Sequence, residues 1–458
     1  MRDLKIMTLV TVLLLFVSSC GKVEITNPVI DGFTPTRGPA GTRVTIAGKR
    51  FADTPAGNAV SLNGVPAEVV SATTTQLVVV VPAGATTGQF AVTTSGGLGS
   101  NSASFVVTRL VGGSVQGVRL SLAGSVSTVA GFAGVAGSSD GSAGSALFSR
   151  PYGLAADTTT LYITDRGNHT IRTMDIATGL VTTIAGAPGV SGSTDGVGSA
   201  ARFNSPAGVT ILGGKLYICD SGNHTVRQID LATRQVTTLA GSPGIAGAAD
   251  SVGSGTALGA SARFNAPAGI TTDGSFLYLC DSGNQTVRRV DPTTGSVVTV
   301  AGLAGVTGSA DSPIRFNNPT GIASDGARLF IFDSNNQTLR VFDIASGRIV
   351  TVAGFPGLIG SSGGRGGAVR FNFPTGITTD GGVLYLTDTV NHTVRTFAPD
   401  SGLFSTGVVG PLAGAAGTPG NVDGTGSGAL FSGPTGITTD GTSLFVADTE
   451  NHTIRMIR

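Results

Sequence analysis

Short apolar runs separated by polar turns repeat along most of the chain. One unit reads PAGVTI from Pro206, KLYICD from Lys215, TVRQID from Thr225 and VTTLAG from Val236. Each run has the length of a β-strand, and the Gly, Asp and Asn residues between the runs are turn formers. The runs carry no helix signal. The pattern therefore predicts a unit of four consecutive strands.

An octapeptide marks six copies of this unit. The copies read DRGNHTIR, DSGNHTVR, DSGNQTVR, DSNNQTLR, DTVNHTVR and DTENHTIR, and they begin at Asp165, Asp220, Asp281, Asp333, Asp388 and Asp448. Successive copies start 52 to 61 residues apart, a period that suits one four-stranded propeller blade with an extended loop. The chain is therefore predicted to be all-β, with a six-bladed β-propeller over residues 126–458.

The end of the chain predicts how the propeller closes. The sixth unit stops at Arg458 after its third strand, whereas residues 126–131 read VSTVAG, a fourth-strand sequence that precedes any first strand. Pairing of residues 126–131 with residues 453–458 would complete the last blade and cover an exposed sheet edge.

The octapeptide resembles the signature of the NHL-repeat family, D-x-x-N-H-x-[IV]-R between the second and third strands of a blade. The resemblance covers about residues 126–458 and implies a six-bladed propeller. Gln285 and Gln337 stand where the other four copies carry His. A role that needs an imidazole in every blade is therefore not expected, whereas a structural role tolerates the change.

A second module precedes the propeller. Residues 27–107 include PVIDGFTPTRGPAGTRVTIAGKRF from Pro28 and continue through alternating strands, which resembles an IPT/TIG domain, a small immunoglobulin-like sandwich. Residues 108–125 contain Gly and Ser and are expected to be a linker, with its boundary uncertain by one strand.

The first twenty residues have the layout of a bacterial lipoprotein signal. Arg2 and Lys5 precede an apolar stretch, which ends in VSSC at Cys20. Residues 1–20 are therefore expected to be removed and Cys20 to be lipidated, and by resemblance Gly21 favours the outer membrane. The alternatives are an ordinary cleaved signal or a membrane anchor, although the apolar stretch is shorter than the ~20 residues of a spanning helix.

Charge argues against nucleic acid as a partner. The chain has 28 basic and 27 acidic residues and a formal net charge of +1. Some NHL propellers bind RNA on a basic face, but a balanced, exported chain offers no such surface. The expected partners are an envelope or extracellular protein or a glycan, the expected membrane contact is the lipid anchor alone, and the protein is expected to be a monomer.

Candidate chemistry is confined to repeat positions. All four histidines of the chain are octapeptide residues, and every propeller Asp falls into a repeated class. Acid–base catalysis and transition-metal sites need a singular, converging set of side chains. No catalytic residue, metal ligand or cofactor is therefore predicted, although calcium, which accepts Asn, Asp and carbonyl oxygens, stays compatible with such loops. Cys219 and Cys280 stand at equivalent second-strand positions of neighbouring blades. A disulfide needs Cα atoms within about 7 Å, whereas such positions diverge from the propeller axis, so both residues are expected to be buried thiols.

The octapeptides are interpreted first as structural. Asp and Asn are expected to bond across the turn between the second and third strands, and Arg to reach a neighbouring carboxylate or carbonyl. The alternative is a polar binding rim on the same face. Its candidate residues are Asn168, His169, Asn223, His224, Asn284, Gln285, Asn336, Gln337, Asn391, His392, Asn451 and His452. The Phe that precedes the first strand of each blade is expected to be inter-blade core.

The leading functional hypothesis is a lipid-anchored extracytoplasmic binding or scaffold protein whose propeller rim contacts protein or glycan. The first alternative is a metal-dependent hydrolase or lyase, of the lactonase or amidating-lyase kind, in the propeller channel. The second is a purely architectural role in an envelope assembly.

Overall fold

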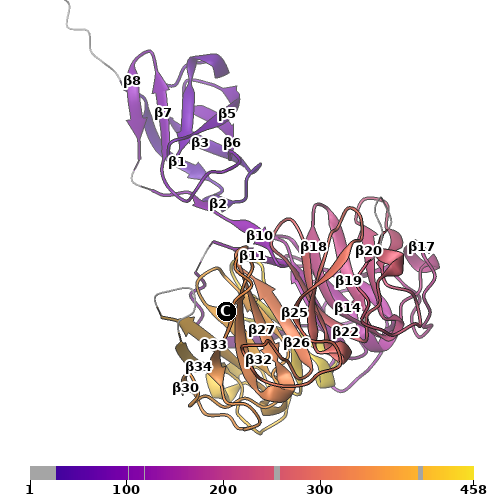
Figure 1. The fold of residues 1–458 in the computed structure, drawn as a ribbon. Helices are drawn as coiled ribbons and strands as arrows, with labels where there is room; N and C mark the ends of the chain where they lie inside the picture. Colours follow the sequence, from indigo (N-terminus) through magenta and orange to yellow (C-terminus); the bar gives the residue numbers. More distant parts are fainter. Residues whose placement is uncertain (1–26, 102, 118, 252–257, 401–405) are drawn as a thin grey trace, which may run out of the picture. The chain divides into compact units, whose positions relative to one another are not determined.

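The computed structural model describes residues 27–101, 103–117, 119–251, 258–400 and 406–458. The chain divides into two compact units, Met1–Val107 and Thr108–Arg458. Over the described residues both units are built from strands, with helices limited to short 3-10 turns (Figure 1). No helix in that part of the chain is long and apolar enough to cross a membrane. The expected signal over residues 1–20 and the lipidation at Cys20 lie outside the described residues.

The first unit is the expected immunoglobulin-like domain. Its strands pair in the order β1-β3-β6-β5-β4-β7-β8, and β2 pairs in parallel with β9. Phe33, Phe90 and Phe105 pack with their rings edge to face or tilted in a core of alternating buried residues. The strand bounds are β1 Val29–Thr34, β2 Arg37–Gly38, β3 Arg43–Lys49, β4 Ala59–Leu62, β5 Val65–Ala72, β6 Gln76–Val80, β7 Phe90–Thr94, β8 Gly97–Ser100 and β9 Val106–Val107.

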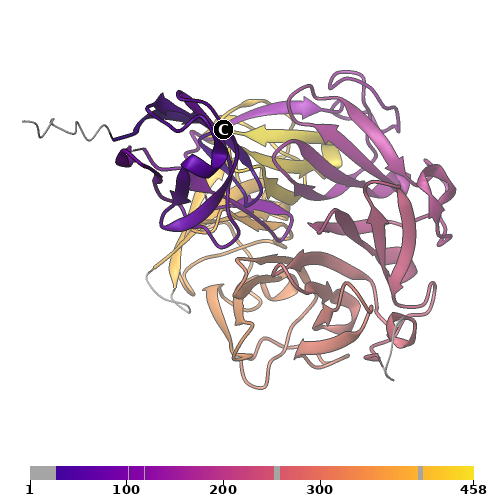
Figure 2. The ribbon, with the colours of Figure 1, turned by 90° about the horizontal axis from the view of Figure 1, so that it is seen from above.

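The second unit is a ring of six antiparallel four-stranded sheets (Figure 2). The first five blades follow the chain. They are β13 Pro151–Ala156, β14 Thr160–Asp165, β15 Thr170–Asp175 and β16 Val181–Ala185; β18 Pro206–Leu212, β19 Lys215–Asp220, β20 Thr225–Asp230 and β21 Gln235–Ala240; β22 Pro267–Thr272, β23 Leu277–Asp281, β24 Thr286–Val290 and β25 Val297–Gly302; β26 Pro319–Ser324, β27 Arg328–Asp333, β28 Thr338–Asp343 and β29 Ile349–Gly354; and β31 Ile377–Thr379, β32 Leu384–Asp388, β33 Thr393–Pro399 and β34 Gly407–Ala413.

The sixth blade closes the ring as predicted. It consists of β36 Pro434–Thr439, β37 Leu444–Asp448, β38 Thr453–Ile457 and, as its outer strand, β12 Ser125–Ala130. β12 pairs antiparallel with β38, with Val126 opposite Ile457 and Thr128 opposite Arg455. The prediction that residues 126–131 complete the last blade is confirmed. Three two-residue strands, β17 Gly196–Val197, β30 Gly364–Arg365 and β35 Gly424–Thr425, extend the outer edges of blades two, five and six.

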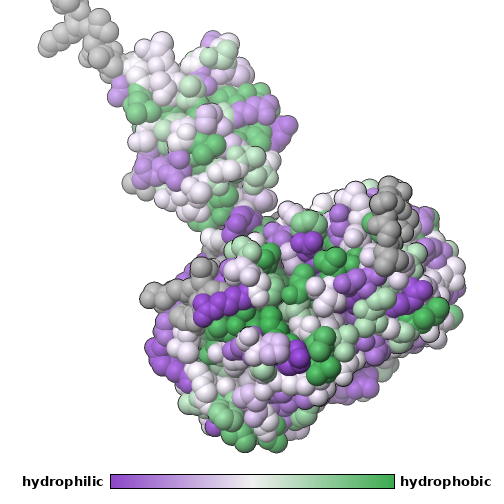
Figure 3. Space-filling view, viewed as in Figure 1, coloured by the Kyte–Doolittle hydropathy of each residue, from purple (hydrophilic) through white to green (hydrophobic). Residues whose placement is uncertain are grey.

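The core lies between blades. The six predicted core phenylalanines are all fully buried: Phe148, Phe203, Phe264, Phe316, Phe371 and Phe431. Large apolar side chains that remain exposed include Phe132 and Phe355, in the turns that follow outer strands. On the propeller face visible in Figure 3, hydrophobic and hydrophilic residues are interspersed.

The segment expected to be a linker contains a structured hairpin. β10 Arg109–Val111 pairs with β11 Ser114–Gln116, and both strands belong to the propeller unit. Ser114 and Gln116 are buried. The expectation of a plain linker over residues 108–125 is therefore corrected, because this hairpin packs on the inner strands of the blades.

Candidate functional site

The octapeptide builds a buried ion-pair network in every blade. In the second blade, Asp220 Oδ1 accepts a hydrogen bond from the Asn204 backbone N–H at 2.7 Å. Its Oδ2 accepts from Asn223 Nδ2 at 2.7 Å and from Arg227 Nη1 at 2.9 Å. The Asp220 and Arg227 side chains are both fully buried. The same set of contacts recurs around the ring, which confirms the structural interpretation of the octapeptide.

The arginine of each octapeptide also reaches the loop between blades. Arg227 Nη2 pairs with Asp195 at 2.7 Å, and its guanidinium lies 5.1 Å from the Phe203 ring centroid. The fifth blade departs from this pattern, because Gly363 stands where the other loops carry Asp and Pro411 stands where the other outer strands carry Thr. In the other blades that Thr donates its backbone N–H to the loop Asp, which a Pro cannot do. The loop carboxylate is therefore an accessory partner.

Desolvation controls the titration of the buried carboxyls. Burial raises the pKa of Asp220 to about 6, against the opposing Arg227 charge and the hydrogen bonds from Asn204 and Asn223. Burial likewise raises the pKa of Asp165, Asp333 and Asp448 to about 6. These carboxylates are ionised at neutral pH. This agrees with the hydrogen bonds, because the two oxygens of each carboxylate accept from three donors, namely a backbone N–H, an Asn amide and an Arg guanidinium.

The fifth octapeptide residue latches each blade to the next. It adopts a left-handed conformation, with φ between 58° and 61°. His169 Nδ1 accepts the Ser205 N–H at 3.0 Å, and in the last blade His452 Nδ1 accepts the Arg150 N–H at 3.0 Å. Gln337 places Oε1 in the same position, 2.7 Å from the Phe373 backbone N. Both residue types supply an acceptor, which explains why either His or Gln can occupy this position of the octapeptide.

Replacing latch histidines by Gln is expected to remove an acid sensitivity of folding. Burial lowers the pKa of His169, His392 and His452, because the charged imidazolium is desolvated and, for His452, Arg150 adds to this while Glu450 opposes it. Protonation of Nδ1 also breaks the latch. Since the folded pKa lies below the unfolded value of about 6.5, the stabilisation is present above pH 6.5 and is lost as the pH falls below it.

The variant H169Q/H392Q/H452Q should match the wild type within about 1 kcal/mol at pH 8 and be the more stable of the two near pH 5, since each latch contributes about 0.5–1.5 kcal/mol. Urea unfolding of both chains from pH 8 to 5 measures this. Both carry the same buried carboxyls, so the difference isolates the imidazoles. Parallel pH profiles would contradict the latch.

The structure places the side-chain amides of the six candidate asparagines in the fold rather than on the rim. Asn223 donates one amide hydrogen to Asp220 and the other to the Gly192 carbonyl, and its counterparts in the other blades make the same two bonds. The asparagine donors are thus occupied. Of the twelve candidates, His169 alone lines the cavity described below.

The propeller axis is narrow because the inner strands approach closely. Each blade has one glycine, in its inner strand or, in the fifth blade, directly before it, at which a Cβ would collide with a carbonyl of the next blade, so that glycine is required there. These residues are Gly153, Gly208, Gly269, Gly321, Gly376 and Gly436. The cavity on the axis measures about 60 Å³ and is lined in part by Leu154, Val209, Ile270, Ile322, Ile377 and Ile437. The middle of the channel is therefore a narrow constriction lined in part by aliphatic side chains.

The β10–β11 hairpin covers one end of the channel. The Gly113 carbonyl accepts the Ala156 N–H, and Ser114 Oγ lies 2.5 Å from Thr378 Oγ1. Gln116 Nε2 donates to the Ser324 carbonyl at 2.7 Å. These partners lie at the ends of inner strands, whereas the octapeptides pair with the beginnings of those strands. The hairpin and the octapeptides therefore lie at opposite ends of the channel.

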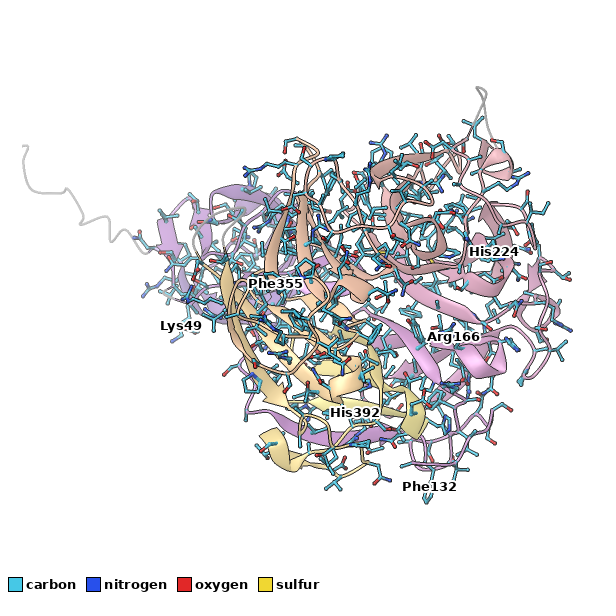
Figure 4. The ribbon with its side chains drawn as sticks, turned by 60° about the horizontal axis from the view of Figure 1, so that its bottom comes forward. Lys49, Phe132, Arg166, His224, Phe355 and His392 are labelled. Carbon is cyan, nitrogen blue, oxygen red and sulfur yellow. The ribbon has the colours of Figure 1, made fainter. Side chains whose placement is uncertain are left out.

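A cavity of about 460 Å³, lined mostly by residues with polar side chains, lies at the octapeptide end, and we call it the mouth. It shares Tyr152 and Thr435 with the cavity on the axis. Its lining comes from widely separated parts of the sequence, namely Arg150, Tyr152, Arg166, Gly167, His169, Ser205, Thr389, Gly433, Thr435, Thr449 and Glu450. In Figure 4, Arg166 lies nearer the middle of the propeller than Phe132.

Two pairs of side chains in the mouth break the six-fold repetition. Arg166 lies over the Tyr152 ring, 4.7 Å from its centroid. The other five blades have Ser or Thr at the position of Arg166, and Ala or Thr at that of Tyr152. Arg150 pairs with Glu450 across the junction of the first and last blades. Burial raises the pKa of the Tyr152 phenol against the opposing charge of Arg166, so this hydroxyl stays neutral and can donate.

The remaining candidate chemistry is limited. Among the described residues, no group of three or more His, Cys, Asp or Glu is arranged to hold a metal ion. Cys219 and Cys280 are free and buried, as predicted, and burial raises the pKa of both thiols well above the ordinary value. The arrangement can bind a ligand at the mouth by hydrogen bonds and charge.

Sequence reasoning missed Tyr152 and Arg166 because it looked for what the repeats share. The available signal was a difference between the repeats. The other five blades have a hydroxyl residue, Ser or Thr, at the position of Arg166, and Ala or Thr at the position of Tyr152. Two departures from the repeat that meet in space are therefore the signal by which sequence reasoning could have found this pair.

Comparison with known proteins agrees with this architecture. The IPT/TIG domain family matches residues 28–107, and the NHL repeat family matches residues 203–229 and 371–397. Protein SUPPRESSOR OF QUENCHING 1, chloroplastic, of Arabidopsis thaliana is 30% identical over 290 residues, which are 59% of this chain and 26% of that protein. NHL repeat-containing protein 2 of Homo sapiens is 28% identical over 333 residues, which are 65% of this chain and 44% of that protein. The chain thus spans less than half the length of either relative.

Solved structures share the fold. A structural genomics protein of unknown function from Bacteroides thetaiotaomicron has a TM-score of 0.56 at 19% identity, covering 94% of this chain and 98% of that chain. An auxiliary nutrient binding protein from the same organism has a TM-score of 0.54 at 19% identity, covering 94% and 97%. The chain therefore carries segments that match the NHL repeat family, within a six-bladed β-propeller that follows an IPT/TIG domain.

Proposed function

We propose that this chain is a lipid-anchored binding protein of the cell envelope whose propeller binds its ligand in the mouth. The observation that carries the proposal is the concentration of non-repeated polar side chains, Tyr152, Arg166, Arg150 and Glu450, around a cavity of about 460 Å³. A cavity of this size with a few convergent polar groups is typical of small-ligand sites. The hairpin at the other end of the channel leaves the mouth as the face for access.

The similarity to a Bacteroides protein described as an auxiliary nutrient binding protein is compatible with this proposal, since that protein shares the fold. It does not identify a ligand. The ligand is inferred from the side chains of the mouth.

The double variant Y152T/R166T is expected to fold normally and to lose the ligand. Thr is the residue that this chain itself uses at both positions in the fifth and sixth blades, where Thr449 Oγ1 donates to the Pro151 carbonyl. The melting temperature should therefore change by no more than a few degrees. Native mass spectrometry of both chains after incubation with an envelope extract measures bound small molecules. Equal capture by the two chains would contradict the mouth as the site.

The anchor is tested separately. Cys20→Ser is expected to shift the protein from the membrane fraction to the soluble fraction, because in this proposal attachment depends on lipid at that residue alone. The measurement is fractionation followed by immunoblotting, with far-ultraviolet circular dichroism as the control for folding. Unchanged membrane retention would contradict lipidation at Cys20.

A further inference from the structure

The charge balance of the mouth favours one negative charge on the ligand. Arg150 is neutralised by Glu450, whereas the recorded partner of Arg166 is the neutral Tyr152 ring. Asp165 beside it is bound to Arg172 inside the blade. His169 is neutral, since its Nδ1 accepts a backbone N–H and burial lowers its pKa. Among the described residues of the mouth, one positive charge therefore lacks a carboxylate, and a guanidinium matches the two oxygens of a carboxylate.

The wall of the mouth that the fifth and sixth blades form offers acceptors. Thr435 Oγ1 and Thr449 Oγ1 lie 2.6 Å apart, so one of these hydroxyls donates to the other, and the remaining hydrogen goes to the Pro151 or the Tyr152 carbonyl. Thr389 Oγ1 likewise bonds the Pro434 carbonyl and Thr375 Oγ1. The hydroxyl hydrogens are thus used within the protein, so the remaining oxygen lone pairs are what these threonines present to a ligand. Such a wall suits ligand groups that donate, above all hydroxyls.

The donors lie on the Arg166 side. Arg166, Tyr152 and His169 all line the mouth. Their guanidinium, hydroxyl and Nε2–H are donors, and the Nε2–H tautomer of His169 is the one required when Nδ1 accepts. A ligand that complements both walls carries anionic oxygens at one end and several hydroxyls at the other.

From this complementarity we infer that the mouth binds a hydroxylated monocarboxylate of the sugar-acid class, with the carboxylate on Arg166 and the hydroxyls on the wall formed by Thr389, Thr435 and Thr449. The inference rests on the proposed function and names its ligand class. A cavity of about 460 Å³ accommodates one such ring together with water.

Isothermal titration calorimetry of the full chain tests the inference with three probes. D-Galacturonate carries both features, D-galactose lacks the carboxylate and acetate lacks the hydroxyls. The expected result is a dissociation constant for galacturonate at least tenfold lower than that for either control, with R166T bringing galacturonate to the level of galactose and R166K recovering part of the difference. The matched control is R202L, which removes an Arg outside the mouth at a position where two other blades carry Leu147 and Leu430. It should bind galacturonate as the wild type does.

Equal affinity for galacturonate and galactose, an unchanged affinity in R166T, or no saturable binding of galacturonate would overturn the inference. The proposed function fails on a different result, because capture from the extract does not depend on the ligand class. If Y152T/R166T loses a captured neutral molecule, the mouth remains the binding site and the sugar-acid assignment is wrong.

Discussion

Asp220→Asn is expected to lower the free energy of unfolding by about 3–5 kcal/mol. Asp220 and Arg227 are both fully buried, so the substitution leaves the guanidinium charge without its buried counter-ion. The new amide also places a donor against existing donors in either orientation, since Asp220 accepts from a backbone N–H on one oxygen and from Asn223 and Arg227 on the other. Urea unfolding followed by circular dichroism at pH 7.5 measures the loss.

Asp195→Asn is the matched control, because it removes the second carboxylate from the same arginine. The Asp195 side chain is 46% exposed, and the fifth blade lacks this residue altogether. The expected loss is about 1 kcal/mol, as for exposed ion pairs. If D220N and D195N cost the same, the buried pair is not what stabilises the blade.

Val126→Asp is expected to destabilise the propeller by a similar 3–5 kcal/mol, because it places a carboxylate without a cation in the closing blade. Val126 is 3% exposed and packs in a cluster with Leu444, Val446 and Ile457. The effect should be large although residue 126 lies more than 300 residues from its partners in sequence. Thermal and urea unfolding of the full chain give the measurement.

Ser125→Asp, one position earlier on the exposed face of the same strand, controls for local charge and should change the stability by less than about 1 kcal/mol. An equally small effect of Val126→Asp would contradict closure of the ring by β12.

Repetition explains why so much of the propeller was predictable. The Asp, Asn and Arg that stand at Asp220, Asn223 and Arg227 in the second blade recur with the same spacing in all six octapeptides. Such a constant spacing of three polar residues indicates that the octapeptides share one local structure. The closing strand was predictable for the same reason, since VSTVAG is recognisable as a fourth strand wherever it stands. The occurrence of both His and Gln at the fifth octapeptide position was explained only by the structure. It shows that this position requires a hydrogen-bond acceptor for a backbone N–H and does not require an imidazole.

The hairpin and the mouth were not predictable in the same way. Residues 109–116 form strands of three residues, too short for a periodic signal, and their partners such as Thr378 and Ala156 are set by the ring. The mouth joins Tyr152 and Arg166 of the first blade to Thr435 and Glu450 of the last. Their proximity follows from closure and not from spacing along the chain, so a search for shared residues passes over them.

A crystal structure of the chain grown with D-galacturonate tests the central claim, that the mouth binds a sugar acid, most directly. We expect electron density for one sugar acid in the mouth, with its carboxylate within hydrogen-bond distance of the Arg166 guanidinium and its hydroxyls toward Thr389, Thr435 and Thr449. A mouth without the sugar at a saturating concentration, or the sugar bound on another face of the chain, would contradict it.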